Sequence, residues 1–228
     1  QRVADKVVGT IPFARETLHP KRTNLGYRKQ VDSDPLLRAA NAFIIPGSIH
    51  EYNPTVSQME LDRVKDATGD TNIYPDRNAP YKLELKVTNS KGEELTKQFH
   101  LSPDTREEFQ KARGGYNYFY IQDAVNNSRY LNLGAEEQAS ILTKIKGYSN
   151  YKATRELMEG NGYNYDVSLY SKVYSAEQSG ITPVEYYTIK GLAESAGSKK
   201  EERVSALQDN GVTGSTYDFF FSRVWGYK

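Results

Sequence analysis

Residues 81–115, YKLELKVTNSKGEELTKQFHLSPDTREEFQKARGG, contain the clearest change of hydrophobic period in the chain. Apolar and charged residues alternate from Tyr81 to Val87, and the alternation returns through Leu95 and Phe99 after the turn-forming stretch NSKGE. Two alternating runs on either side of such a turn predict a β-hairpin. One face of this hairpin is polar and a lone hairpin is only marginally stable, so we expect its apolar face to pack on a helix or on a partner.

A helix is predicted to begin directly after the hairpin. Ser102 is a good N-cap, Pro103 suits the first helical position, and acidic residues follow in the first turns. Gly114 and Gly115 then interrupt the pattern, and two adjacent glycines cost a helix about 2 kcal/mol relative to alanine. The pair indicates a kink, a break or a close approach of two helices, and the sequence leaves these alternatives open.

The longest helical pattern covers residues 135–159 and is followed by three shorter ones. Its expected buried side comprises Ala139, Leu142, Ile145 or Lys146, Ser149 and Ala153. The later segments 166–180, 182–197 and 199–211 each begin with a capping residue and end with glycine. The last third of the chain is therefore predicted to be a set of short helices joined by tight turns.

The region before the hairpin is predicted to be less regular. Residues 9–33 show no sustained period and contain prolines and a basic cluster, which indicates an extended arm, and 34–43 predict a short helix. A further helix is expected after Asn53 as N-cap, with Pro54 at its first position and Gly69 as C-cap. Its modest apolar stripe comprises Val56, Met59 or Glu60, Arg63 or Val64, and Ala67.

The chain is therefore predicted to be mainly α with one β-hairpin, an α+β fold. We divide it into an extended arm with short helices (1–80), a β-hairpin with long helices (81–159) and a small helical C-terminal unit (160–228). The first residue is Gln and no signal-peptide pattern follows, so we expect a fragment, a processed product or the ordered part of something longer.

Composition excludes several kinds of site. The 228 residues include no cysteine, which rules out disulfides, thiolate metal sites and a cysteine nucleophile. The formal net charge of +1 gives no overall attraction to nucleic acid or membrane, and no apolar run approaches the roughly 20 residues that span a bilayer. The strongest bias is the 18 tyrosines, which suit thin layers and contact surfaces or reflect compositional drift.

Catalytic and metal-binding motifs are not recognised. The three histidines, His19, His50 and His100, lack metal-ligand spacing, and there is no phosphate loop or nucleophile elbow. A carboxylate pair for glycoside cleavage stays open, although no pair stands out. We therefore expect no cofactor and no small-molecule substrate.

The segment GNGYNYDVSLYSK, residues 160–172, resembles the start of a calcium loop. With Gly162 at the sixth position of such a loop, the first position is Leu157 and the twelfth is Ser168, so the first and last ligands are missing. The same residues are explained by a glycine C-cap at Gly160 or Gly162 and an N-cap at Asp166. We predict a turn here and no metal.

Contacts with partners are expected from two kinds of side chain. The basic stretch HPKRTNLGYRK, residues 19–29, suits solvent, an acidic partner surface or phosphates, with DNA contact not expected. Aromatic residues follow the glycine pair and recur near the C-terminus on more than one helix face. The candidate partner contacts are Arg15, Lys21, Arg22, Tyr116, Tyr118, Phe220 and Trp225.

Several segments, taken in order, resemble a family. They are IPFARETLHPKRTNLGYR (11–28), DPLLRAANAFIIPGSIHEYNP (34–54), LDRVKDATGDTNIYP (61–75) and LSPDTREEFQKARG (101–114). Together they are similar to the C-terminal region of tape-measure-like proteins of tailed phages and related large virion proteins, over about residues 9–160. The sequence departs from the pattern at His19, where a proline is expected, and in its longer hairpin and missing ligating acids.

The resemblance implies a non-enzymatic structural protein of the phage tail, made in the host cytoplasm. Such proteins set tail length, plug the tail tube and leave ahead of the genome, and their C-terminal ends meet tail-tip, hub or distal-tail proteins. A homo-oligomer is expected, with membrane contact only through missing parts of the parent chain. The alternatives are an internal head protein ejected with DNA by a short-tailed phage, a cell-wall hydrolase that aids genome delivery, and a nucleic-acid-binding module.

Overall fold

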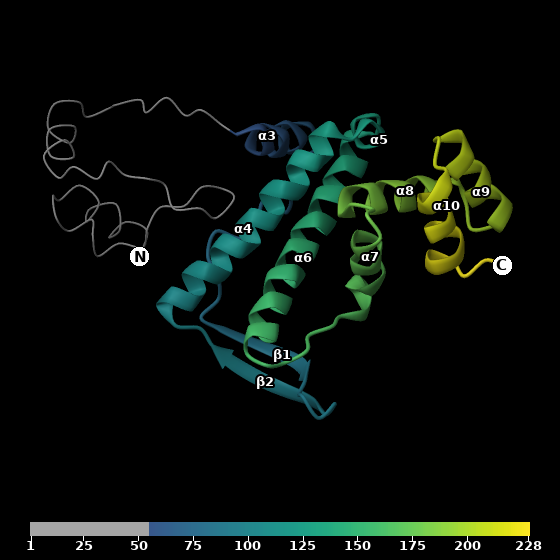
Figure 1. Cartoon of the computed structure of the whole chain (residues 1–228). Helices are drawn as coiled ribbons and strands as arrows, with labels where there is room; N and C mark the ends of the chain where they lie inside the picture. The colour runs from purple at the N-terminus through teal and green to yellow at the C-terminus, as the bar shows by residue number, and fades with distance from the viewer. Residues whose placement is uncertain (1–54) are drawn as a thin grey trace, which may run out of the picture.

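The computed structural model describes residues 55–228, and this part of the chain is mainly helical with one antiparallel β-hairpin, as predicted (Figure 1). The predicted arm and the helix at 34–43 lie outside the described residues. The elements are α3 (Val56–Thr68), β1 (Lys82–Thr88), β2 (Glu94–His100), α4 (Pro103–Asn126), α5 (Ser128–Leu131), α6 (Ala135–Gly160), α7 (Ser168–Gln178), α8 (Pro183–Ala196), α9 (Lys200–Asp209), α10 (Gly214–Asp218) and the π-helical η2 (Phe219–Val224).

Helix α3 begins later than the sequence predicts. Its N-cap is Thr55, whose side chain accepts a hydrogen bond from the Gln58 N–H, so the predicted cap at Asn53 is wrong. The C-cap at Gly69 is confirmed, with φ of 75° in the left-handed region. The buried side is formed by Ser57, Gln58, Glu60, Leu61 and Val64.

The predicted apolar stripe of α3 is therefore only partly right. Val64 is fully buried, but Val56 and Met59 are 52% and 56% exposed. The polar alternative at the second position, Glu60, is buried instead, because a tyrosine and an arginine satisfy its carboxylate. Hydrophobicity alone did not decide which side of this helix faces the core.

The β-hairpin is confirmed, with Lys82 opposite His100 and Thr88 opposite Glu94. Its apolar face packs on the body at only a few points: Val87 is buried, and Leu83 contacts a small cluster of Ala79, Leu101, Phe109 and Ala153. Tyr81 is 63% exposed, and the guanidinium of Arg106 lies 3.6 Å from its ring centroid. Almost all of β2 is solvent-exposed.

Helix α4 runs unbroken for 24 residues through Gly114 and Gly115, so the predicted kink or break does not occur. Its predicted start is confirmed, because the Ser102 side chain accepts a hydrogen bond from the Thr105 N–H over 3.1 Å. Helices α4 and α6 lie side by side along most of their length (Figure 1), and Gly114 is buried in α4. The remaining alternative, a close helix–helix approach, agrees with this packing.

Helix α6 is the centre of the fold, and its predicted buried side is confirmed. Ala139, Leu142, Ile145, Ser149 and Ala153 are all buried, and Ile145 is the buried member of the pair with Lys146. The predicted C-terminal helices are confirmed as α7, α8 and α9. One hydrophobic cluster includes Leu61 of α3, Ile145 of α6 and Phe220 of η2, so the three segments defined from the sequence share a core.

The turn at 160–164 explains the segment that resembles a calcium loop. Gly162 has φ of 78°, and the N–H groups of Gly162 and Tyr163 donate to the carbonyls of Glu159 and Met158 over 3.0 and 2.9 Å. These two bonds form a Schellman motif, which places the C-terminal glycine at Gly162 and leaves Gly160 inside the helix. The predicted N-cap at Asp166 is wrong, because α7 begins after Val167.

Candidate functional site

The described tyrosines bond repeatedly to carboxylates on other elements. The central case is Glu177 of α7, which accepts hydrogen bonds from Tyr120 of α4 over 2.5 Å and from Tyr148 of α6 over 2.7 Å. Lys152 of α6 adds an ion pair with the same carboxylate at 3.0 Å. We call these four residues the Glu177 cluster; it ties three helices together through a single carboxylate.

Burial controls the protonation of this cluster. Tyr120 and Tyr148 are 1% and 0% exposed. Loss of solvent raises the pKa of both phenols, and their hydrogen bonds to the negative Glu177 raise it further. Both hydroxyls therefore remain protonated donors, which suits them to structural hydrogen bonds.

A second buried carboxylate connects α3 to α5. Glu60 is 5% exposed and accepts a hydrogen bond from the Tyr130 hydroxyl over 2.7 Å. Arg63 binds the same carboxylate with Nε and Nη2 at 2.8 and 2.7 Å, and its Nη2 also donates to Gln138 of α6. We call these residues the Glu60 cluster; burial and the bond to Glu60 raise the pKa of Tyr130.

The tyrosine rings also pack against one another between α4, α6 and α7. The ring centroids of Tyr120 and Tyr148 lie 5.8 Å apart, those of Tyr148 and Tyr151 5.8 Å apart, and those of Tyr151 and Tyr170 5.0 Å apart. Gly147 permits this arrangement, because a Cβ at that position would lie 2.6 Å from the Tyr170 hydroxyl. In this part of the protein the tyrosine bias serves interhelical packing.

The first aromatic pair among the candidate contacts lies partly inside the body. Tyr116 is half-buried, stacks on Tyr120 with a centroid distance of 6.1 Å, and donates a hydrogen bond to Glu156 of α6. Tyr118 is also half-buried, and its hydroxyl accepts a hydrogen bond from Gln122 over 2.8 Å. Phe119, between them in the sequence, is 63% exposed and was not among the candidates.

The C-terminal pair requires a correction. Phe220 is fully buried and stacks on Tyr186 with a centroid distance of 5.4 Å, so it cannot contact a partner while this core is intact. Trp225 is half-buried, 5.5 Å from the Phe220 ring, and its buried Nε1 has no hydrogen-bond partner among the described residues. Arg15, Lys21 and Arg22 lie outside the described residues.

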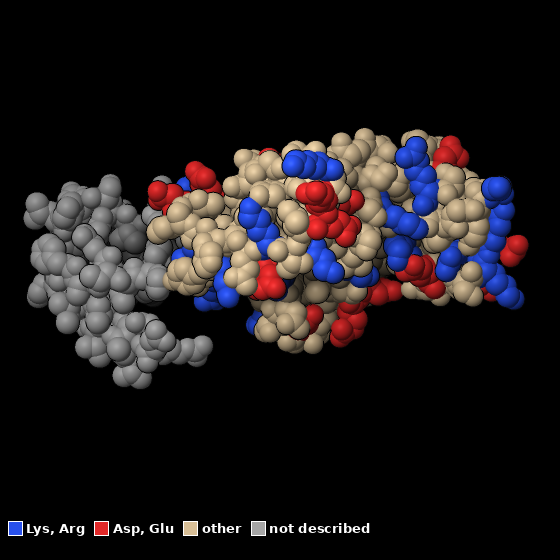
Figure 2. Space-filling view, turned by 90° about the horizontal axis from the view of Figure 1, so that it is seen from below, with Lys and Arg blue, Asp and Glu red and all other residues tan. Residues whose placement is uncertain are grey.

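Other apolar side chains occupy the surface. Charged side chains of both signs are interspersed over the face seen in Figure 2. The large apolar side chains that are mostly or partly exposed are Val56, Met59, Tyr81, Leu95, Phe119, Leu131 and Leu169. The exposure of Phe119 and Leu169 could not be read from their hydrophobicity, which alone predicts burial.

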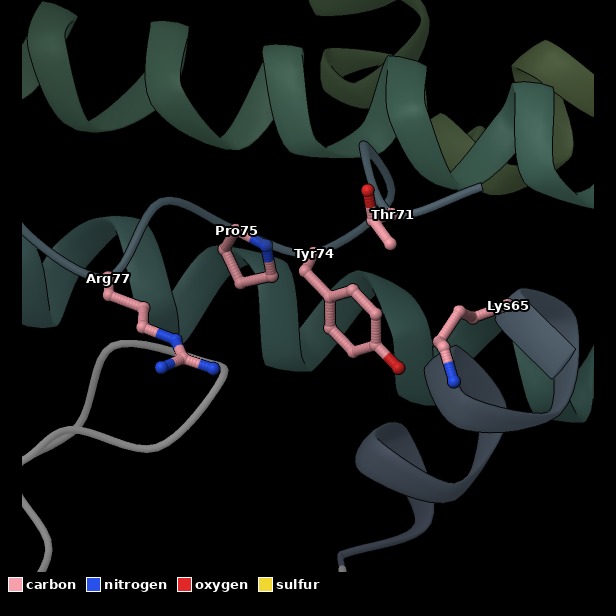
Figure 3. A pocket seen from close by; sticks show the side chains of 5 residues that line it. All are labelled: Lys65, Thr71, Tyr74, Pro75 and Arg77. Carbon is pink, nitrogen blue, oxygen red and sulfur yellow. The ribbon is translucent and has the colours of Figure 1, made fainter. Parts of the chain in front are cut away.

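A hollow lies where the loop after α3 passes the end of that helix (Figure 3). Its volume is about 410 Å³, and it is lined by Lys65, Thr71, Tyr74, Pro75 and Arg77. Acidic residues accompany its polar groups: Tyr74 donates a hydrogen bond to Asp62, and Lys65 pairs with Asp66 at 2.7 Å. This mixture of charges does not select a ligand of one sign.

Within residues 55–228, no group of three His, Asp or Glu side chains is placed to hold a metal ion. No helix in the same range is both long and apolar enough to cross a membrane. His100 lies exposed at the end of β2, and the other two histidines are outside the described residues.

Comparison with known proteins gave no relative: no family model, no curated protein and no solved structure matches the chain. The similarity to phage tape-measure-like proteins stays a prediction from the sequence.

Proposed function

We propose that this chain is a non-enzymatic structural protein of a tailed-phage virion, the C-terminal part of a tape-measure-like tail protein. In this role it contacts tail-tip, hub or distal-tail proteins and is released during genome delivery. The proposal rests on the ordered sequence segments described above, and the architecture supports it in one respect.

The supporting observation is the way the polar interior is used. Glu177, Glu60 and Glu156 each accept a hydrogen bond from a tyrosine on a different element. Such contacts hold helices in register, and they occupy the acidic groups that general acid–base chemistry needs free. A body cross-linked in this way is suited to transmitting contacts between neighbouring proteins.

The partner surface we propose is centred on the N-terminal half of α3 and the middle of α4. The Ser57 hydroxyl donates to the Tyr118 carbonyl over 3.3 Å, so these two parts of the body adjoin. Val56 and Met59 of α3 and Phe119 of α4 are all more than half exposed. Exposed apolar and aromatic side chains of this kind are common at the centres of protein interfaces.

Fractionation of purified virions tests the proposal. Antibody against this chain should label purified tails and leave DNA-filled heads unlabelled, and the label should disappear from particles that have delivered their genome. Detection in heads alone would support the internal head protein instead. Absence from every particle fraction would exclude a virion role.

The enzyme alternative needs its own test. The purified chain should give no clearing in a peptidoglycan zymogram. Clearing that is lost on substitution of one acidic residue, with the fold unchanged, would contradict the non-enzymatic assignment.

A further inference from the structure

The outer edge of β2 carries a set of backbone groups that the hairpin does not use. The Leu101 N–H donates to the Tyr81 carbonyl and the Asn89 N–H donates to the Glu93 carbonyl, so the odd-numbered residues bond within the hairpin. Hydrogen bonding alternates along an antiparallel pair. The N–H and C=O groups that point away from β1 are those of Glu94, Thr96, Gln98 and His100.

The outer edge of β1 is treated differently. Thr88 and Asn164 exchange two backbone hydrogen bonds of 2.9 and 2.8 Å, which anchors the hairpin to the turn after α6. Among residues 55–228 no strand pairs with the outer edge of β2, which lies on the side of the hairpin away from the helices (Figure 1). An open edge is a template for another strand, and two strands alone are marginally stable.

We propose that two copies of this chain pair antiparallel through the outer edges of β2. The result is a four-stranded sheet in the order β1-β2-β2-β1 with a two-fold axis at Lys97. Because only even-numbered residues offer free backbone groups, Glu94 must face an even-numbered residue of the second copy. In the symmetric register Glu94 faces His100 of the second copy, and Thr96 faces its Gln98.

Charge complementarity on the polar face favours this register. In one copy Lys82 lies beside His100, so Glu94 of the second copy would complete a row of two basic groups and one acid. In the next row Glu84 accepts a hydrogen bond from Gln98 over 3.2 Å. Thr96 and Lys86 of the second copy would extend that row, and opposite charges across strands stabilise a sheet.

The apolar face gives a second argument for the same register. Leu95, 40% exposed, would face Phe99 of the second copy, an aromatic–aliphatic pair of the kind that stabilises sheets. The two Lys97 side chains meet at the axis, but each Nζ lies 4.4 Å from its own Tyr163 ring centroid and bonds to that hydroxyl. This contact directs both charges onto their own subunits.

Other registers lose these pairs. Moving the pairing by two residues in either direction places Lys97 opposite Leu95 or Phe99 of the second copy and separates Glu94 from His100. A shift by one residue would oppose used and unused backbone groups. The self-pairing does not depend on the virion role proposed above.

Disulfide trapping tests the register, because the chain has no cysteine of its own. Facing residues at the axis form a non-hydrogen-bonded pair with Cα atoms about 4.5 Å apart, which a disulfide can bridge. Mild oxidation should therefore convert Lys97→Cys into a covalent dimer. The matched control is Lys91→Cys in the hairpin turn, whose two copies would lie roughly 40 Å apart.

Two further variants exclude a merely unfolded hairpin. Thr96→Pro removes an outward N–H and should turn a dimer into a monomer in sedimentation velocity, with the far-ultraviolet circular dichroism unchanged. Glu94→Lys should weaken the dimer, and adding His100→Glu should restore it. Equal cross-linking of Lys97→Cys and Lys91→Cys, or a wild-type chain that is monomeric at every concentration tested, would overturn the proposal; absence from virions would overturn only the proposed function.

Discussion

Tyr148 of α6 donates a hydrogen bond to Glu177 of α7 over 2.7 Å, and neither group has an equivalent partner within its own helix. Tyr120 of α4 donates to the other oxygen of the same carboxylate over 2.5 Å. Helix α7 buries only Val173 and Ala176, so its apolar contacts are few. The position of α7 on α4 and α6 therefore depends strongly on one carboxylate.

Removal of that carboxylate should destabilise the protein. Glu177→Ala leaves two buried hydroxyls without an acceptor, and we expect a loss of about 1–3 kcal/mol per unsatisfied group in urea unfolding. The matched control is Glu159→Ala, which removes a 51% exposed partner of Arg155. An exposed pair of this type contributes about 0.3–0.5 kcal/mol, so equal losses for the two variants would contradict the assigned role of Glu177.

A double-mutant cycle isolates the bond itself. Tyr148→Phe should cost about 1 kcal/mol in the wild-type chain. In the Glu177→Ala background the same change removes a hydroxyl that already lacks its acceptor, so it should cost much less or stabilise. Additive effects would show that Tyr148 and Glu177 are energetically independent.

Stability should fall at alkaline pH. The pKa values of Tyr120, Tyr148 and Tyr130 are raised by burial and by bonds to carboxylates, and burial raises the pKa of Tyr186 to about 12. Tyrosines of the unfolded chain ionise near pH 10, so the native state then binds more protons than the unfolded state. This stabilisation is fully present below about pH 10 and is lost as the pH rises toward the native pKa values.

Urea unfolding at a series of pH values checks this expectation. The free energy of unfolding attributable to tyrosine should be constant from neutral pH to about pH 9 and decline above it. Tyr120→Phe, which removes one of the raised groups, should reduce the slope of that decline. A stability that rises between pH 9 and 11 would contradict the assignment.

The secondary structure was largely predictable because its signals are local. Ser102 with Pro103 started a helix as expected, and the alternating run from Lys82 to Thr88 formed a strand. The buried side of α6 followed from a regular helical period. Each of these features depends on residues within a few positions of one another.

The polar interior could not be predicted because its partners are distant in the sequence. Tyr120 and Glu177 are 57 residues apart, and Glu60 and Tyr130 are 70 apart. Without those partners Met59 is the better apolar candidate on α3, and only the bond to Tyr130 makes burial of Glu60 favourable. Phe220 was assigned to a partner for the same reason, since nothing near it in the sequence indicates the contact with Tyr186.

Phe220 and Phe119 should behave differently when truncated. Phe220→Ala removes a fully buried ring and should cost about 3–5 kcal/mol through the cavity that it leaves. Phe119→Ala removes a ring that is 63% exposed and should change stability by no more than about 0.5 kcal/mol. Thermal unfolding of both variants checks this, and similar midpoints would show that one of the two burial assignments is wrong.

Calcium should leave the thermal midpoint unchanged. The turn at 160–164 is closed by two backbone bonds around Gly162, and Asp166 accepts a hydrogen bond from Tyr151 over 3.2 Å. A ligand that bound the native state alone would raise the midpoint with concentration. Titration with calcium, with magnesium as the control cation, should therefore give superimposable melting curves; a rise specific to calcium would reopen the case for a metal at this turn.

The two glycines of the same turn should respond in opposite directions to alanine. Gly162 has φ of 78° and a Cβ added there would meet nothing within 4 Å, so the cost of Gly162→Ala is purely conformational and should be about 1–2 kcal/mol. Gly160 is helical with equally open surroundings, so Gly160→Ala should be neutral or stabilise by up to about 1 kcal/mol. Urea unfolding of the pair separates them, because a reversed order would move the helix end from Gly162 to Gly160.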